Sequence, residues 1–171
     1  MLETARAAVA LLAEHDIPHL IIGGVAVQEH GYPRVTIDVD VVVPDVLEAV
    51  EFLTSVLTGP FYRVPDFPDR IEDRRTGVFI DLLPAGGVVK PGCKVAFPHP
   101  TKAAGQLQIV TLEELISLKL DSWVNNPAKR LRDKADVTEL ILRRGLPRTL
   151  AINPAVASLY LETWDAIQSE Q

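Results

Sequence analysis

The sequence predicts an α+β fold: a mixed sheet flanked by helices and followed by C-terminal helices. Two observations carry this prediction. Apolar, β-branched runs at 35–43 and 78–83 are typical of buried strands, whereas neighbouring segments repeat their apolar residues at helical intervals. Beyond residue 110 only helical patterns follow. We therefore expect a sheet-bearing core over residues 1–110 and a helical part over residues 111–171, packed on the core as one compact domain.

Periodicity and boundary residues place each element. The expected helices are 2–14, 24–30, 46–57, 112–123, 128–143 and 153–167. The expected strands are 19–22, 35–43, 61–64, 70–73, 78–83 and 107–110. The connection over 84–106 is rich in glycine, proline and lysine, and we expect at most a short strand within it, at 88–89 or 94–97.

Three helix ends have residues that explain them. Asp45 follows the strand-breaking Pro44 and can cap the helix over 46–57. Thr111 and Glu114 have the spacing of a capping box, in which each side chain bonds the other residue's backbone N–H. Gly145 stands just past the helix over 128–143, where a left-handed residue ends many helices.

Composition narrows the range of partners. The chain has 171 residues, 47% of them hydrophobic, and a formal net charge of −6, which disfavours a long nucleic acid as partner. Cys93 is the single cysteine, so no intrachain disulfide forms and a reducing compartment is expected. Residues 1–16 lack the pattern of a signal peptide, and no apolar run approaches the roughly 20 residues of a membrane span. We expect a cytoplasmic protein without a membrane partner.

A pair of acids in the run 35–43 is the strongest chemical signal. Asp38 and Asp40 are two residues apart, so a strand would point both carboxylates to one face. Two like charges in a buried strand repel each other and are costly to desolvate unless a cation lies between them. The pair therefore predicts a divalent metal ion.

A glycine pair precedes these acids. Gly23 and Gly24 follow the apolar run 20–22 directly and open the short helix expected over 24–30. Glycine lets the backbone approach a ligand closely, and a helix N-terminus attracts phosphate. A glycine turn opposite a strand with two acids is an arrangement suited to a nucleoside triphosphate and its metal ions.

A third acid, Asp81, lies within the apolar run 78–83. Burial statistics alone favour an edge residue or a capped turn for such a lone acid. A helix and a hairpin separate it from Asp38 and Asp40, however, and we expect a neighbouring antiparallel strand to bring it beside them.

These residues together resemble a known family. The pattern of two glycines, a short helix and R-x-T-x-D-x-D is similar to the nucleotidyltransferase fold of the DNA polymerase beta superfamily, in the form of AbiEii-type toxins and of aminoglycoside and lincosamide nucleotidyltransferases. The matching residues are Gly23, Gly24, Arg34, Thr36, Asp38 and Asp40. The resemblance extends to Lys119 on one later helix and to Asp133 and Asp136 on the next.

The resemblance implies catalytic and binding roles. Asp38, Asp40 and Asp81 would bind two Mg²⁺ ions, or Mn²⁺ in their place, and Asp81 would also serve as general base. The glycine pair would offer backbone N–H groups to phosphates, and Lys119 would bind the triphosphate. Arg34 and Thr36 would complete the nucleotide site.

Simpler structural explanations exist for the helical residues. Lys119 lies on a helix whose other face is apolar, so a solvated lysine is an equal alternative. Asp133 and Asp136 are one turn apart and are most simply explained as an exposed charged face paired with neighbouring basic residues. Orientation of Lys119 and contact with the nucleotide base are the alternatives.

The implied function is transfer of a nucleoside monophosphate from a triphosphate such as ATP to a hydroxyl group. The acceptor would be a tRNA, a protein or a small molecule. The resemblance also allows a role as a toxin that has a cognate partner protein. The alternative is a catalytically silent module of the same fold that binds a nucleotide or a protein. A metal protein of another kind is a distant third, because no histidine or cysteine cluster has ligand spacing.

Overall fold

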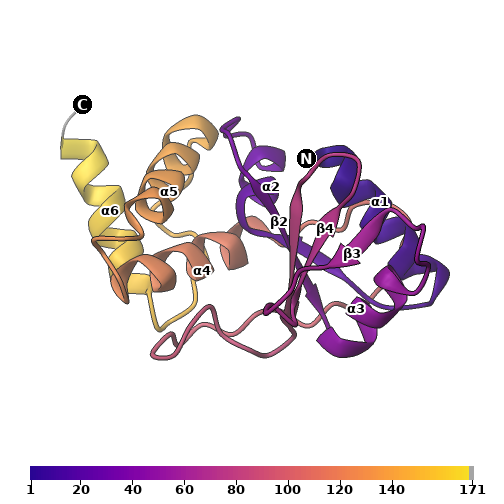
Figure 1. The fold of residues 1–171 in the computed structure, drawn as a ribbon. Helices are drawn as coiled ribbons and strands as arrows, with labels where there is room; N and C mark the ends of the chain where they lie inside the picture. Colours follow the sequence, from indigo (N-terminus) through magenta and orange to yellow (C-terminus); the bar gives the residue numbers. More distant parts are fainter. Residues whose placement is uncertain (170–171) are drawn as a thin grey trace. The chain divides into compact units, whose positions relative to one another are not determined.

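The computed structural model describes residues 1–169 (Figure 1). Its helices are α1 (Leu2–Glu14), α2 (Gly23–Glu29), α3 (Val46–Thr54), α4 (Leu112–Val124), α5 (Leu131–Arg144) and α6 (Ala157–Ser169). Its strands are β1 (Leu20–Ile22), β2 (Asp38–Val43), β3 (Phe61–Arg63), β4 (Arg70–Asp73) and β5 (Phe79–Pro84).

The chain forms two compact units, and neither is a continuous stretch of sequence. Unit 1 comprises Met1–Ala26, Arg34–Gly87 and Phe97–Val110. Unit 2 comprises Val27–Pro33, Val88–Ala96 and the residues from 111 onward. All strands and the helices α1 and α3 belong to unit 1, whereas α4, α5 and α6 belong to unit 2.

Unit 1 is built on a mixed sheet, as the sequence predicts. The strand order is β1-β2-β5-β4-β3, and every neighbouring pair is antiparallel except β2 and β5. The expectation of an antiparallel strand for Asp81 is therefore wrong. The helix α3 leads the chain back, so that β3 runs in the same direction as β2. The strand β4 is antiparallel to β3, and β5 is antiparallel to β4, so β5 again runs parallel to β2.

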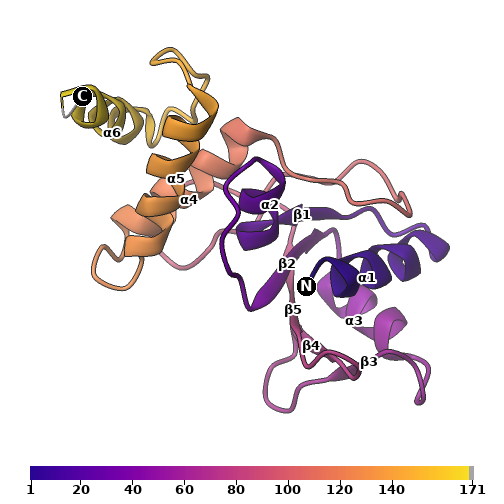
Figure 2. The same ribbon diagram turned by 90° about the horizontal axis from the view of Figure 1, so that it is seen from above.

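One face of the sheet carries the core of unit 1. The helices α1 and α3 pack there on the same side of the strands (Figure 2). The inward residues alternate along β2 and β5, as a two-residue strand period requires. They are Val39, Val41 and Val43 on β2 and Ile80 and Leu82 on β5. The acids of these two strands consequently belong to the opposite face.

The central strand is shorter than predicted. It begins at Asp38 instead of Val35, because β1 ends opposite Asp40 and β5 begins opposite Asp38, leaving no partner strand for 35–37. The two hydrophobic side chains of that segment, Val35 and Ile37, are exposed.

Two other predicted strands are reduced to single bridges. Over 107–110, Ile109 forms an isolated parallel bridge with Ile21, and the Ile21 backbone N–H donates to the Gln108 carbonyl (2.7 Å). In the connection that follows β5, Val88 and Ala96 form an isolated antiparallel bridge. Both segments thus run beside a neighbour without forming a regular ladder.

Helix ends largely follow the predicted boundary residues. Asp45 caps α3 through the Glu48 backbone N–H (3.0 Å), and Thr111 and Glu114 form the capping box of α4. Gly145 ends α5 in the left-handed conformation. The largest difference is α6, which begins at Ala157 and not at 153.

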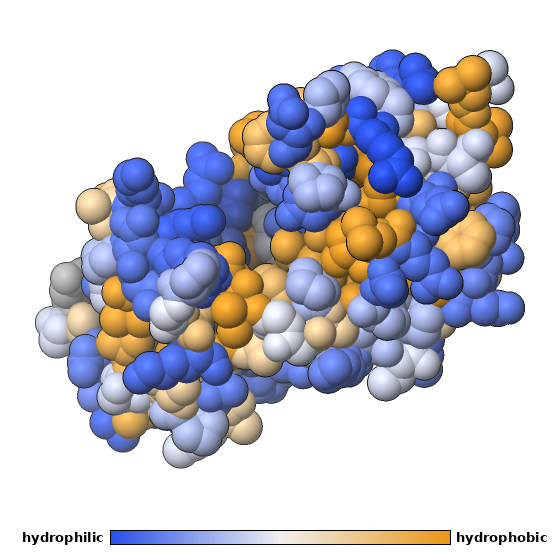
Figure 3. All heavy atoms as spheres, turned by 60° about the horizontal axis from the view of Figure 1, so that its bottom comes forward, coloured by the Kyte–Doolittle hydropathy of each residue, from blue (hydrophilic) through white to orange (hydrophobic). Residues whose placement is uncertain are grey.

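Unit 2 is held by packing of α4, α5 and α6. Its buried side chains include Leu115, Leu120, Leu140 and Tyr160. Exposed hydrophobic side chains occur in both units, and on the face drawn in Figure 3 hydrophobic residues are bordered by hydrophilic ones. Among the described residues, none of the helices combines the length and apolar character that crossing a membrane requires.

Candidate active site

The glycine pair forms a tight turn against β2. Gly23 has φ of +62°, a conformation that favours glycine. A Cβ atom on Gly23 would overlap the Asp40 carboxylate and lie 2.7 Å from its Cγ, and one on Gly24 would lie 2.7 Å from Cβ of Thr36. Both positions therefore need glycine, because a side chain at either one would collide with Asp40 on β2 or with Thr36 just before it.

The two strand acids share one face, as predicted. In β2 they are half-buried, whereas Val39 and Val41 between and after them are fully buried in the core. Asp38 accepts a hydrogen bond from Thr36 Oγ1 at its Oδ1 (3.3 Å) and at its backbone oxygen (3.4 Å). The Thr36 hydroxyl thus orients the first acid while its carbon atoms contact the glycine turn.

The third acid lies beside the second. Asp40 and Asp81 are direct register partners in the parallel pair of β2 and β5. On the next strand Arg70 is the register partner of Asp81. Register partners share a face, so the sheet carries one row of charged residues across three strands, in the order Asp40, Asp81, Arg70.

Arg70 is a residue that sequence reasoning missed. Its Nε donates to Asp81 Oδ1 (2.6 Å) and its Nη2 donates to Asp81 Oδ2 (2.8 Å), a bidentate pair. The guanidinium also lies over the rings of Phe67 (5.4 Å) and Phe79 (5.3 Å). The hairpin register could have revealed the pair, because a turn at 74–77 sets Arg70 opposite Asp81.

The charge of Arg70 is strongly stabilised. Its hydrogen bonds to Asp81 raise the pKa of the guanidinium, and the nearby carboxylates of Asp81, Asp38 and Asp69 raise it further against the opposing effect of burial. Asp38 therefore acts electrostatically on Arg70 across the sheet.

Arg34 lies next to the glycine turn. Its Nη1 donates to the Val35 carbonyl (3.0 Å), and its Nη2 would be 3.3 Å from a Cβ atom on Gly24. Seven of the eight predicted site residues thus gather in unit 1. They are Gly23, Gly24, Arg34, Thr36, Asp38, Asp40 and Asp81.

Lys119, the eighth, belongs to unit 2 and is tied to two carboxylates. Its Nζ lies 2.7 Å from Asp133 Oδ1 and 2.9 Å from Asp136 Oδ2, and its side chain is 11% exposed. Ser122 Oγ donates to the other oxygen of Asp133 (2.7 Å). The alternatives of a solvated lysine and of an exposed acidic face are therefore wrong, because these residues line the buried contact between α4 and α5.

The predicted metal ligands have the donor chemistry of a divalent-ion site. Carboxylate oxygens are the donors that Mg²⁺ prefers, and the register of Asp38, Asp40 and Asp81 suits a shared ion. Within residues 1–169, however, no three acidic, histidine or cysteine side chains are grouped as metal ligands. Donor type and strand register fit the ion, whereas both oxygens of Asp81 are engaged by Arg70.

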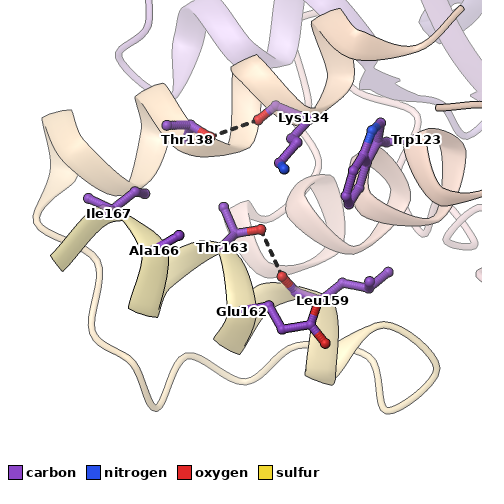
Figure 4. A pocket seen from close by; sticks show the side chains of 8 residues that line it. All are labelled: Trp123, Lys134, Thr138, Leu159, Glu162, Thr163, Ala166 and Ile167. Atoms are coloured by element: carbon purple, nitrogen blue, oxygen red, sulfur yellow. Dashed lines mark hydrogen bonds between the residues drawn. The ribbon is translucent and has the colours of Figure 1, made fainter. Parts of the chain in front are cut away.

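Unit 2 contains a separate hollow of about 240 Å³ between α4, α5 and α6 (Figure 4). Lys134 Nζ lies 4.5 Å from the centre of the Trp123 ring, and both residues line it. Two hydroxyls at its wall are turned to helix carbonyls: Thr138 Oγ1 donates to Lys134, and Thr163 Oγ1 donates to Leu159. None of the predicted site residues lines this hollow.

The chain is similar in fold to solved structures, although no family model and no curated protein matches its sequence. The fold matches the solution structure of the antibiotic-resistance factor ANT(2'')-Ia, an aminoglycoside nucleotidyltransferase, with a TM-score of 0.51 and 16% sequence identity. The match covers 99% of this chain and 94% of that one. At this identity it establishes a nucleotidyltransferase-like fold, and the narrower resemblance to AbiEii-type toxins stays a prediction.

Proposed function

We propose that the chain is a metal-dependent nucleotidyltransferase, which moves a nucleoside monophosphate from a nucleoside triphosphate to a hydroxyl group of an acceptor. One observation carries the proposal: Asp38 and Asp40 share a strand face against a turn whose glycines leave no room for a side chain. The fold shared with ANT(2'')-Ia supports the same reaction class.

Asp38 and Asp40 would hold the divalent cation, with Asp81 as a further ligand and general base. Bound Mg²⁺, as two ions or with Mn²⁺ in its place, would supply Lewis-acid activation of the acceptor hydroxyl and neutralise charge on the leaving pyrophosphate. The Thr36 hydroxyl would keep Asp38 oriented through their hydrogen bond.

Other residues would bind the nucleotide. Gly23 and Gly24 are the first two residues of α2, and their backbone N–H groups would face phosphate oxygens. Arg34, beside this turn, would add a positive charge. Lys119 stays a predicted triphosphate ligand; its ammonium is paired with Asp133 and Asp136 and has a third N–H donor.

The proposed acceptor is a hydroxylated compound, a protein or a tRNA. A cationic small molecule suits the net charge of −6 better than a polyanionic RNA does. A role as a toxin with a cognate partner protein, and a cytoplasmic location, remain part of the proposal.

The decisive experiment is calorimetric titration of each of the four nucleoside triphosphates with Mg²⁺ into the wild type, Asp38→Ala and Glu51→Ala. Glu51 is an exposed acid on α3 and serves as the matched control. We expect Mg²⁺-dependent binding of at least one triphosphate by the wild type and by Glu51→Ala, and none by Asp38→Ala. Equal binding by all three proteins would contradict the assignment of the site.

A silent nucleotide-binding module is the second candidate. The observation that favours it is the bidentate pairing of Asp81 with Arg70, which occupies a carboxylate needed for turnover. Pyrophosphate release distinguishes the two functions. A silent module would bind the triphosphate without releasing pyrophosphate in the presence of candidate acceptors.

A further inference from the structure

Arg70 is a cation built into the row of acids where the divalent ion is proposed to bind. We propose that Arg70 competes with this ion for Asp81, so that Asp81 becomes a metal ligand only after it releases the guanidinium. This inference rests on the proposed function and adds a positioning residue to its site.

Both carboxylate oxygens of Asp81 are hydrogen-bonded to Arg70. Each carboxylate oxygen accepts one hydrogen bond from Arg70, at 2.6 Å and 2.8 Å. The cross-strand register holds the two backbones opposite each other, so the pair needs no rearrangement of the sheet. Each oxygen keeps a second lone pair, but an ion bound there would lie beside the guanidinium charge unless Arg70 gave up one of its short, charge-assisted hydrogen bonds.

The surroundings of Arg70 hold it in this position. Phe67, from the loop before β4, and Phe79, on β5, both have their rings within 5.4 Å of the guanidinium carbon. The Arg70 side chain is 31% exposed and that of Asp81 is 19% exposed, so water screens the pair only in part. Aromatic contacts and hydrogen bonds thus select a single orientation of the guanidinium.

Deprotonation cannot remove the charge of Arg70. An arginine guanidinium stays charged in proteins, and Asp81, Asp38 and Asp69 each raise the pKa of Arg70 further. Arg70 therefore leaves Asp81 only by displacement. Displacing Arg70 therefore makes the free energy of metal binding less favourable, and this penalty disappears when the guanidinium is removed by substitution.

The test measures Mn²⁺ binding without nucleotide, from the electron paramagnetic resonance signal of the free ion. The proteins are the wild type, Arg70→Gln, Arg70→Lys, Asp81→Asn and the double variant Arg70→Gln/Asp81→Asn. Arg63→Gln is the control, because it removes one arginine from the same sheet at a position paired with the core residue Ile71. Circular dichroism checks that each variant is folded.

We expect Arg70→Gln to bind Mn²⁺ about tenfold more tightly than the wild type, a change of ~1.4 kcal/mol. Arg70→Lys keeps the charge but loses the bidentate fork, so its affinity should lie between the two. The gain should vanish in the double variant, because Asp81 is the ligand that the substitution exposes. Arg63→Gln should change the affinity by less than about twofold, because Arg63 is exposed and its charge is largely screened.

The outcomes separate this inference from the proposed function. If the wild type binds Mn²⁺ and Arg70→Gln binds it equally well, Arg70 does not compete for Asp81 and only this inference fails. A gain that persists in the double variant contradicts it too, since the effect would then be one of net charge. If neither the wild type nor Arg70→Gln binds Mn²⁺, the proposed metal site fails and the inference fails with it.

Discussion

At the scale of single residues, the glycine turn and the acids depend on each other. Gly23 adopts a positive φ and also leaves the space that the Asp40 carboxylate fills. Gly145 shares the positive φ but has open space around its Cβ position, and Gly105 has neither condition. Alanine substitutions at these three glycines therefore separate two contributions to the free energy of unfolding: the strain of a left-handed alanine and the steric overlap of its Cβ with a neighbour.

We expect Gly23→Ala to lower the free energy of unfolding by about 2–3 kcal/mol, because a left-handed alanine is strained and its Cβ displaces Asp40. Gly145→Ala has the same sign of φ but open space around the Cβ, and should cost about 1 kcal/mol. Gly105→Ala has neither condition and should change stability by less than about 1 kcal/mol in either direction. Urea denaturation measures all three. Equal losses for Gly23→Ala and Gly145→Ala would show that contact with Asp40 contributes nothing.

At the scale of elements, α4 and α5 meet through a buried ion cluster. One ammonium from α4 is shared by two carboxylates of α5, and Asp136 has a side chain only 1% exposed. Removing the cation would take the nearest counter-charge from two buried carboxylates and leave Asp133 the more exposed Arg130 guanidinium at 3.8 Å, which costs more than the pair itself contributes.

Lys119→Met should accordingly destabilise the protein by about 3–5 kcal/mol, as measured by urea denaturation at neutral pH. Glu139→Gln on the same helix α5 breaks an exposed ion pair with Arg143 and should cost only about 0.3–0.5 kcal/mol. A loss for Lys119→Met as small as that of Glu139→Gln would mean that solvent screens the cluster despite its burial.

The docking of α6 should depend on pH through Tyr160. Its hydroxyl donates to the Pro147 carbonyl (2.8 Å), and burial raises its pKa from 10.0 to about 12. The folded state therefore holds this proton more tightly than the unfolded state does. The resulting stabilisation is complete below pH 10 and is lost as the pH rises to about 12.

Tyr160→Phe should cost about 1 kcal/mol at pH 7 through the lost hydrogen bond. Between pH 10 and about 12 the wild type should lose this advantage while the variant does not titrate at this position. Urea denaturation of both proteins across this interval measures the difference. A constant difference would contradict the raised pKa.

Sequence patterns predicted most elements because their signals are local. Asp45, Thr111 and Gly145 act within one turn of a helix, and the alternation of Asp38 and Asp40 needs only the strand period. Contacts between segments that are distant in the sequence were harder to predict. Arg70 was missed because the prolines before it made β4 an insecure strand, and the turn at 74–77 sets a register only once both strands are recognised. The burial of Lys119 between two carboxylates was not predicted, because periodicity does not say which helix faces which.

At the scale of the whole molecule, the net charge of −6 should select among acceptors. A cationic, polyhydroxylated small molecule should bind more weakly as salt rises from 50 to 300 mM, because the Debye length shrinks from about 14 Å to about 6 Å. A neutral polyol of similar size is the control and should show no such trend. Calorimetry measures both, and affinity of the cationic compound that is independent of salt would contradict an electrostatic contribution to its binding.

The division into two units also has a consequence for synthesis of the chain. Val27–Pro33 leaves the ribosome early, yet the helices of its unit follow only from residue 111 onward. At typical elongation rates that interval is on the order of seconds. Unit 1 is complete once residue 110 has emerged, whereas Val27–Pro33 is synthesised well before the helices α4, α5 and α6 of its unit. Nascent unit 2 would therefore be the part of the chain most dependent on chaperones.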